Sequence, residues 1–251
     1  MSKEEQSDKS AFADMFSGVI GQEYKMLKLI CPLATEMSRL VGIAVNKYAG
    51  LNPEPLNIVE LGGGTGITTL AILLADKNLS VLSVDNEPTM QSQAQASLEQ
   101  WVKQGRLKFS ADDALTALKA IKSKSVDMLA SAYTLHNFQH DYRQQVHQEI
   151  YRVLKPGGQF VNGDRYGLDD ISKHTQTVQH EIAAYFKVLT QLNKLDILEH
   201  WIIHLFNDES ENHVMRESVA LQQLKAVGFA NVTLTNRIEV NALVTATKEK
   251  L

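Results

Sequence analysis

Cysteine is almost absent from this sequence, and long apolar runs are absent altogether. The single cysteine, Cys31, cannot form an internal disulfide, and no apolar run approaches the roughly 18 residues that a membrane span needs. Residues 1–6 also lack the apolar stretch of a signal peptide. These absences predict a cytoplasmic protein that does not span a membrane.

Positive charge is not in excess either. The chain has 25 Lys and Arg residues against 29 Asp and Glu residues, so its formal net charge at pH 7 is -4. A surface that binds nucleic acid without sequence preference normally shows clustered Lys and Arg. The charge balance therefore predicts no nucleic-acid partner and favours a small-molecule substrate.

Several chemical motifs are missing as well. The sequence has no G-x-S-x-G turn, no Walker A loop and no paired C-x-x-C. Each of these motifs supplies a specific chemistry: an exposed serine nucleophile, a phosphate cradle or a set of zinc ligands. Hydrolase, nucleotide-triphosphatase and zinc-finger functions are therefore not predicted.

Apolar residues, which make up 44% of the chain, alternate between short runs typical of strands and spacings typical of helices. Such alternation predicts a doubly wound α/β fold with right-handed crossovers. We expect a seven-stranded, mostly parallel sheet that ends in an antiparallel hairpin. The predicted strands are 58–61, 81–84, 107–109, 126–132, 159–163, 232–235 and 240–245.

Two segments interrupt this alternation. Apolar positions recur at helical spacing over 12–48, where Pro32 marks a break or kink, and 168–212 is a long segment compatible with helices. Both are expected to cap the carboxyl edge of the sheet, where open α/β sheets bind ligands. The apolar N-terminal segment could also pair two subunits as a homodimer. The predicted organisation is a flexible tail (1–10), an N-terminal helical cap (11–52), a core (53–167), a helical insertion (168–212), and a last helix with the terminal strands (213–251).

The most informative segment is a strand that ends in four glycines, with the sequence Ile58-Val59-Glu60-Leu61-Gly62-Gly63-Gly64-Thr65-Gly66. Glycines let the backbone turn sharply and approach a ligand without a Cβ in the way. The dinucleotide pattern G-x-G-x-x-G would need a third glycine at position 67, which is Ile67. The acid Glu60 before the turn also disfavours a pyrophosphate, because both groups are anionic.

This acid-Leu-Gly-x-Gly-x-Gly pattern resembles motif I of the class I S-adenosylmethionine (SAM)-dependent methyltransferases, and the likeness extends over about residues 55–165. The resemblance implies SAM as cofactor and S-adenosylhomocysteine as product. Glu60 and the glycines Gly62, Gly64 and Gly66 would hold the amino-acid end. Asp85, after the second strand, would bind the ribose hydroxyls.

The adenine is assigned by the same resemblance to an acid after the third strand. Asp112 and its neighbour Asp113 compete for this role, and we favour Asp112, since one of the pair could instead cap the following helix. Three further residues are expected to line the cofactor: Asn86, Met90 and Ser131. The turn Lys155-Pro156-Gly157-Gly158 matches the family's structural signature before the fifth strand.

The segment from Ser131 to Phe138 follows the fourth strand and resembles motif IV of small-molecule methyltransferases, where residues face the methyl group. His136 and Tyr133 are therefore the candidate catalytic residues. An imidazole titrates near neutral pH, so His136 could take a proton from an acceptor hydroxyl or amine. A loop histidine that only positions the backbone or the substrate is at least as good an interpretation. The predicted substrate-binding residues are Arg165, Tyr166, Tyr185 and Trp201.

One helix could present three metal ligands. Asp196, His200 and His204 are four residues apart, which places them on the same helix face. The metalloprotease motif would need a Glu at position 201, which is Trp201. The apolar neighbours favour a packed or cavity-lining helix, so no metal is predicted.

The motifs together predict an enzyme that transfers the methyl group of SAM to a small molecule. Two alternatives stay open. The run Asp85-Asn86-Glu87-Pro88 and the late run Glu211-Asn212-His213-Val214-Met215 resemble carboxy-S-adenosylmethionine synthase, which modifies SAM itself. The third interpretation is a SAM-binding protein without catalytic activity. The sequence does not identify the acceptor atom or the acceptor.

Overall fold

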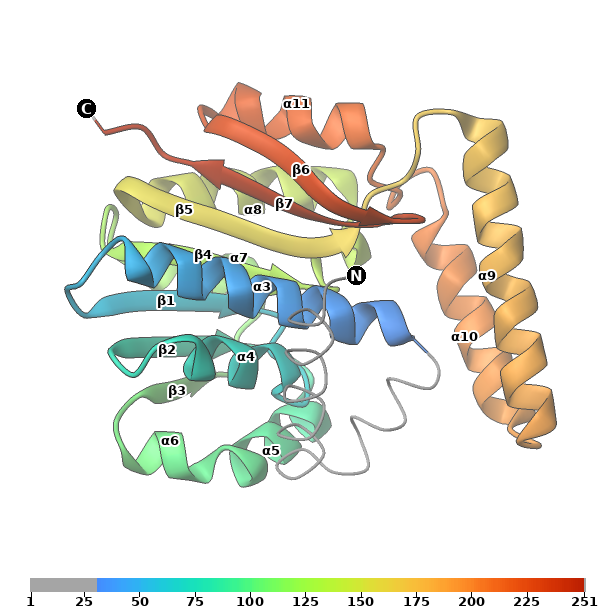
Figure 1. The fold of residues 1–251 in the computed structure, drawn as a ribbon, viewed down its shortest axis with the longest axis horizontal. Helices are drawn as coiled ribbons and strands as arrows, with labels where there is room; N and C mark the ends of the chain where they lie inside the picture. Colours follow the sequence, from blue (N-terminus) through green and yellow to red (C-terminus); the bar gives the residue numbers. More distant parts are fainter. Residues whose placement is uncertain (1–30, 251) are drawn as a thin grey trace, which may run out of the picture.

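The computed structural model describes residues 31–250. The predicted tail (1–10) and residues 11–30 of the predicted N-terminal helical cap (11–52) lie outside these residues. Seven strands form one sheet in the order β3-β2-β1-β4-β5-β7-β6 (Figure 1). The strands are β1 (Leu56–Leu61), β2 (Leu79–Val84), β3 (Leu107–Ser110), β4 (Val126–Ala132), β5 (Leu154–Arg165), β6 (Ala230–Ile238) and β7 (Asn241–Thr247).

The first five strands pair in parallel, whereas β7 runs antiparallel to both β5 and β6. This topology confirms the predicted doubly wound sheet with its terminal hairpin. Strand β4 is buried along its whole length, and β1 is buried at all but one position. Central parallel strands read as continuous apolar runs because helices cover both faces of the sheet.

Helices cover the two faces of the sheet (Figure 1). One face is covered by α3 (Pro32–Gly50), α4 (Ile67–Ala75), α5 (Pro88–Ser97) and α6 (Glu99–Lys103), and the other by α7 (Ala114–Ala120), α8 (His140–Val153) and α11 (Glu217–Val227). Helix α3 begins at Pro32, where the sequence predicts a break. Proline suits the first turn of a helix, whose N–H groups have no partner within the helix.

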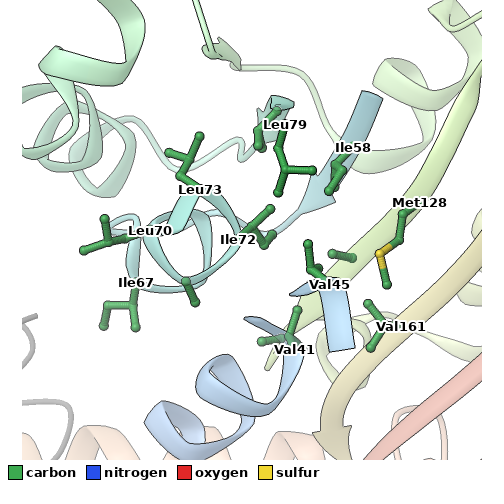
Figure 2. Close-up of a cluster of buried hydrophobic side chains, with 14 of the residues drawn as sticks. Val41, Val45, Ile58, Ile67, Leu70, Ile72, Leu73, Leu79, Met128 and Val161 are labelled. Carbon is green, nitrogen blue, oxygen red and sulfur yellow. The ribbon is translucent and has the colours of Figure 1, made fainter. Parts of the chain in front are cut away.

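One of the two main cores lies between the sheet and helices α3 and α4. Figure 2 shows Val41 and Val45 of α3 beside Ile58, Met128 and Val161 of the strands. All of these side chains are buried. Removing apolar surface from water at this scale is the main stabilising term of such a domain.

The segment predicted as a helical insertion forms two helices, α9 (Ile171–Gln191) and α10 (Leu195–Asp208). They pack side by side beyond the carboxyl ends of the parallel strands (Figure 1). Their contact is a separate apolar cluster of Tyr185, Leu189, Leu198 and Leu205. The two helices therefore form a cap over the sheet edge where the predicted site residues lie.

Among residues 31–250, no helix is both long enough and apolar enough to cross a membrane.

Gly163 of β5 sets how closely α3 packs on the sheet. A Cβ at this position would lie 2.9 Å from both the Cβ and the carbonyl oxygen of Met37 in α3. The substitution Gly163→Ala should therefore lower the free energy of unfolding by about 1–3 kcal/mol, since backbone atoms of a packed helix cannot move aside freely. Urea unfolding measures this, with Gly50→Ala as the control, because a Cβ at Gly50 meets no atom within 4 Å. Equal stability of the two variants would contradict this packing.

Candidate functional site

The glycine turn after β1 is held in a conformation that favours glycine. Gly62, Gly64 and Gly66 have φ angles of 73°, 51° and 94°, which side chains with a Cβ rarely adopt. A Cβ on Gly64 would meet only the sulfur of Met90, at 3.9 Å, so it would project into open space beside the turn. The turn therefore leaves room for a ligand to approach the backbone.

The carboxylate of Asp85, at the end of β2, ties this turn to the next loop. Its Oδ2 accepts a hydrogen bond from the Gly64 N–H at 2.7 Å, and its Oδ1 accepts one from the Glu87 N–H at 2.8 Å. Asp85 is half-buried and Asn86 is exposed at the same edge. The predicted ribose ligand thus lies beside the glycine turn.

Asp112 and Asp113, after β3, have different roles. Asp113 is the N-cap of α7 and accepts from the backbone N–H groups of Leu115 and Thr116, at 3.0 and 3.1 Å. Asp112 is exposed and accepts from the hydroxyl of Ser110. The capping alternative therefore applies to Asp113, which leaves Asp112 as the candidate adenine ligand.

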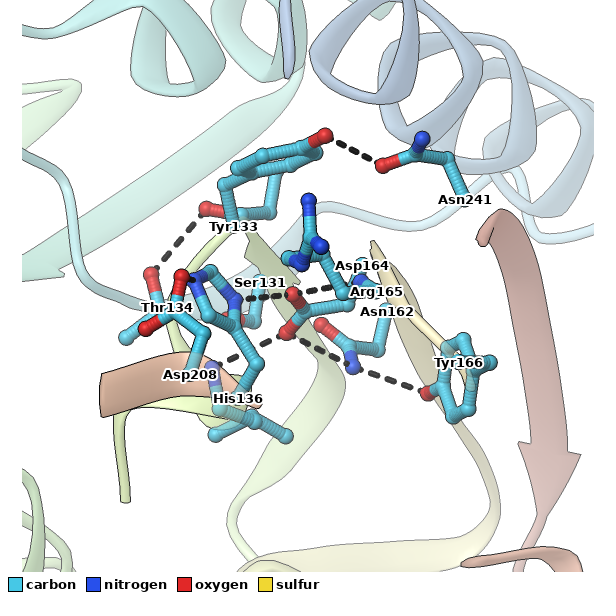
Figure 3. Close-up of polar contacts among 12 residues, drawn as sticks. Ser131, Tyr133, Thr134, His136, Asn162, Asp164, Arg165, Tyr166, Asp208 and Asn241 are labelled. Carbon is cyan, nitrogen blue, oxygen red and sulfur yellow. Dashed lines mark hydrogen bonds and ion pairs between the residues drawn. The ribbon is translucent and has the colours of Figure 1, made fainter. Parts of the chain in front are cut away.

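His136 lies in a short 3-10 turn after β4 and is buried against Asp164, near the end of β5 (Figure 3). The distance from its Nδ1 to Oδ1 of Asp164 is 2.5 Å. Although burial alone would raise the pKa of Asp164, the neighbouring His136 and further hydrogen bonds lower it below its usual value. The carboxylate is thus ionised, Nδ1 of His136 donates the proton, and Nε2 is the ring nitrogen left for other partners.

Nε2 of His136 points to a second carboxylate, that of Asp208 at the end of α10. It lies 3.7 Å from Oδ2 of Asp208, and Nε2 of His204 lies 3.6 Å from the same oxygen. Oδ1 of Asp208 is buried without a hydrogen-bond partner among the described residues. Burial raises the pKa of Asp208 and lowers that of His204, because a low-dielectric environment disfavours the charged form of each.

Arg165, the last residue of β5, links the sheet to the cap. Its guanidinium donates to both carboxylate oxygens of Glu181 on α9, at 2.8 and 3.1 Å, and to Glu209 after α10, at 2.8 Å. Burial acts to lower the pKa of Arg165, but the two glutamates raise it well above its usual value. The charged guanidinium therefore has one carboxylate partner on α9 and another directly after α10.

A cavity of about 440 Å³ lies between the glycine turn, the 3-10 turn and the cap helices. It falls in the size range of small-molecule sites. The predicted residues that line it are Gly62, Gly64, Met90, Tyr133, His136, Arg165, Tyr185 and Trp201. The tertiary structure thus brings both candidate catalytic residues and three of the four candidate substrate residues to one cavity beside the glycine turn.

Other predicted residues do not line this cavity. The hydroxyl of Tyr166 accepts a hydrogen bond from the side chain of Asn162 within the core, and Ser131 donates to the carbonyl of Leu61. Tyr166, predicted to bind the substrate, is therefore wrongly placed for this cavity. Successive residues of an extended strand face opposite sides of the sheet, so Tyr166 shares the core face of Asn162 while Arg165 faces the cavity. Gly66, Asp85, Asn86 and Asp112 lie outside the cavity lining as well.

Glu60 is fully buried beneath the glycine turn rather than in the cavity. Its Oε2 accepts from the hydroxyl of Thr69 at 2.5 Å, while Oε1 has no partner among the described residues. Burial raises the pKa of Glu60 to about 7. Its contact with the amino-acid end of SAM stays a prediction.

Tyr133 adopts an unusual backbone conformation, with φ of 52° directly after β4. Its ring lies edge-on to that of His136, with centroids 5.4 Å apart, and its hydroxyl donates to the side chain of Asn241 on β7 (Figure 3). Burial raises its pKa well above the usual value. Tyr133 therefore shapes the cavity as a neutral phenol.

Three partners of the site are not indicated by the sequence: Asp208, Glu181 and Glu209. Asp208 follows His204 by four residues, so the same helical spacing that grouped Asp196, His200 and His204 could have pointed to it. Asp196 and His200 are exposed, whereas His204 faces the cavity. Of the row Asp196, His200 and His204, only His204 thus lines the cavity.

Residues 58–158 match the family model of a methyltransferase domain. This span runs from β1 into β5 and includes the glycine turn, Asp85, Asp112 and His136. The carboxy-S-adenosyl-L-methionine synthase of Shewanella woodyi is 24% identical over 228 residues, which cover 89% of this chain and 86% of that protein.

Two solved structures share the fold. An O-methyltransferase family protein from Burkholderia thailandensis aligns with a TM-score of 0.62 and 17% identity over 97% of this chain and 63% of that one. The CurJ carbon methyltransferase aligns with a TM-score of 0.61 and 16% identity over 98% of this chain and 69% of that one. This chain thus spans less than two thirds of the length of the first of these proteins, and at such identity the likeness is one of fold.

The different roles of Asp112 and Asp113 predict different effects of substitution. Asp113→Ala should lower the free energy of unfolding by about 1 kcal/mol through loss of the helix cap, whereas Asp112→Ala should leave it within about 0.5 kcal/mol of wild type. Hydrogen bonds, chiefly from Thr116, lower the pKa of Asp113 from 3.8 to about 2. Its stabilising effect is therefore present above pH 4 and lost as the pH falls from about 4 to about 2.

Urea unfolding at pH 7 and near pH 2 measures both effects. The deficit of Asp113→Ala relative to wild type should shrink at the lower pH. A deficit that is independent of pH, or an equal deficit for Asp112→Ala, would contradict the assignment of the cap.

Proposed function

We propose that this chain, whose core is a class I SAM-dependent methyltransferase domain, transfers the methyl group of SAM to a small-molecule acceptor. One observation carries the proposal: a single cavity of about 440 Å³ is lined both by the glycine turn and by the buried His136. A methyl donor at the turn and an acceptor near His136 would share this space. Close, oriented reactants account for much of the rate of such a transfer.

The residues at the carboxyl edge fit SAM. Gly64 offers backbone without a Cβ, and the Asp85 carboxylate beside it has the acceptor oxygens that ribose hydroxyls need. Asp112 is exposed one strand further along, where it would accept from the adenine amino group. When bound, SAM supplies a methyl group on a positively charged sulfur, which makes it a strong methyl donor.

The cavity side of His136 is where the acceptor would bind. Because Asp164 holds the proton of His136 on Nδ1, Nε2 is placed to accept a proton from an acceptor hydroxyl or amine. Apolar side chains, among them Ile67, Ile197 and Trp201, line the rest of the cavity and would exclude water. This lining favours an acceptor with an apolar or aromatic body. The homodimer and the cytoplasmic location stay predictions.

Carboxylation of SAM is a second candidate, favoured by the similarity to carboxy-S-adenosyl-L-methionine synthase along most of the chain. An enzyme for that reaction needs a positively charged side chain in the cavity, which binds the carboxylate group of the ligand. Among the described residues that line the cavity, Arg165 is the one Lys or Arg, and both Glu181 and Glu209 already neutralise it. The geometry therefore supports methyl transfer better.

Calorimetric titration with SAM, S-adenosylhomocysteine and NAD tests the cofactor. We expect SAM to bind and NAD not to bind.

Asp85→Ala should weaken SAM binding at least tenfold, because charge-assisted hydrogen bonds to hydroxyls contribute about 1.5–3 kcal/mol each. Asp76→Ala is the matched control. Asp76 lies at the end of α4 that is far from the glycine turn, and it accepts a hydrogen bond from the N–H of Asn78 in its own loop. Tight NAD binding, or unchanged SAM affinity in Asp85→Ala, would refute this assignment. Mass spectrometry of ligand retained through purification separates SAM from the heavier carboxy-SAM.

His136→Ala should reduce kcat by a larger factor than it reduces SAM affinity, because the imidazole faces the acceptor side of the cavity. Turnover on a panel of phenol, amine, thiol and quinone-like acceptors measures kcat, and calorimetry measures affinity. His200→Ala, an exposed histidine of α10, should behave as wild type. An unaltered rate in His136→Ala would remove this residue from the mechanism, and SAM binding without turnover on any acceptor would favour a binding protein.

A further inference from the structure

The cluster of His136, His204 and Asp208 has a spacing that hydrogen bonding does not explain. Nε2 of each histidine lies 3.6–3.7 Å from the same Asp208 oxygen, which exceeds the usual hydrogen-bond length. The second oxygen of Asp208 also has no partner among the described residues, although its side chain is only 5% exposed. A buried carboxylate without hydrogen bonds is costly unless a cation compensates it.

We propose that His136, His204 and Asp208 bind a divalent transition-metal ion at the floor of the cavity. One donor atom from each of the three residues lies within 4.8 Å of the others. Metal bonds of about 2.0–2.2 Å place neighbouring tetrahedral ligands roughly 3.4 Å apart, so small side-chain movements would complete the site. Two imidazoles and one carboxylate are a donor set that suits zinc or ferrous iron.

The surroundings of the cluster support this proposal. Asp164 accepts a hydrogen bond from Nδ1 of His136, which orients Nε2 toward Asp208. Metal-binding histidines commonly have such an outer carboxylate. Two buried guanidiniums lie near the cluster. Arg165 is paired with Glu181 and Glu209, and Arg143 donates to backbone carbonyl oxygens, among them that of Leu135. Carboxylates therefore outnumber fixed positive charges here, and a dication is favoured electrostatically.

All three ligands also line the cavity, so the remaining coordination positions of the ion would face the acceptor. Coordination through Nε2 replaces the proton-accepting role of His136, because both roles use the same nitrogen. The ion would instead lower the pKa of a coordinated acceptor hydroxyl, which releases its proton to solvent on binding. This last step alone rests on the proposed function; metal binding itself requires neither SAM nor an acceptor.

The test is titration of the full-length chain, dialysed against a chelator, with Zn²⁺ by calorimetry and with Co²⁺ by visible absorption. Wild type should bind one ion per chain. Asp208→Asn and His204→Ala should each weaken binding at least tenfold. Asp164→Asn, which replaces the outer carboxylate by an amide, should weaken it by roughly 10–100-fold. Circular dichroism and SAM titration show that each variant is folded.

The same helix supplies matched controls. Asp196→Asn and His200→Ala alter an acid and a histidine at the same four-residue spacing on α10, but both are exposed, so they should bind Zn²⁺ and Co²⁺ as wild type does. Absence of metal binding by wild type, or an equal loss in the controls and in Asp208→Asn, would overturn the proposal. Neither result would alter SAM binding, so failure of the metal site is distinguishable from failure of the methyltransferase function.

Discussion

The buried carboxylate of Asp164 joins the ends of strands β4 and β5, where the cavity forms. It accepts hydrogen bonds from the backbone N–H groups of Leu135 and Arg165, at 2.9 and 2.8 Å, and from the ring of His136 (Figure 3). One side chain thus fixes the turn after β4, the end of β5 and the imidazole orientation. Because a buried charge needs several partners, these elements must be in register together.

A second set of ion pairs holds the cap over this edge. Arg165 bonds Glu181 of α9 and Glu209 after α10, and Glu209 in turn contacts the ring of His174 at 2.5 Å. Since the two helices have only a small apolar core of their own, these buried charged contacts set their position. The shape of the cavity on the side of the cap helices therefore depends on Arg165.

Much of the fold followed from local sequence patterns. The continuous apolar run 126–132 and the glycine turn predicted strands and a ligand-binding edge, because a parallel sheet brings the carboxyl ends of its strands to one side. Lining of the cavity by Tyr133, His136 and Arg165 followed from their positions at or shortly after the ends of β4 and β5. Tyr166, one residue further, points into the core instead, since successive residues of an extended strand face opposite sides of the sheet.

The sequence by itself determined the sheet, the glycine turn and the acids at the strand ends, because each depends on residues adjacent in the chain. Only the tertiary structure decided which distant side chains meet. His136 and Asp208 are 72 positions apart in the sequence and lie 3.7 Å from each other in space, and no local pattern encodes such a contact. It depends on how α10 is rotated over the sheet, which is set by packing and by buried ion pairs rather than by helix propensity.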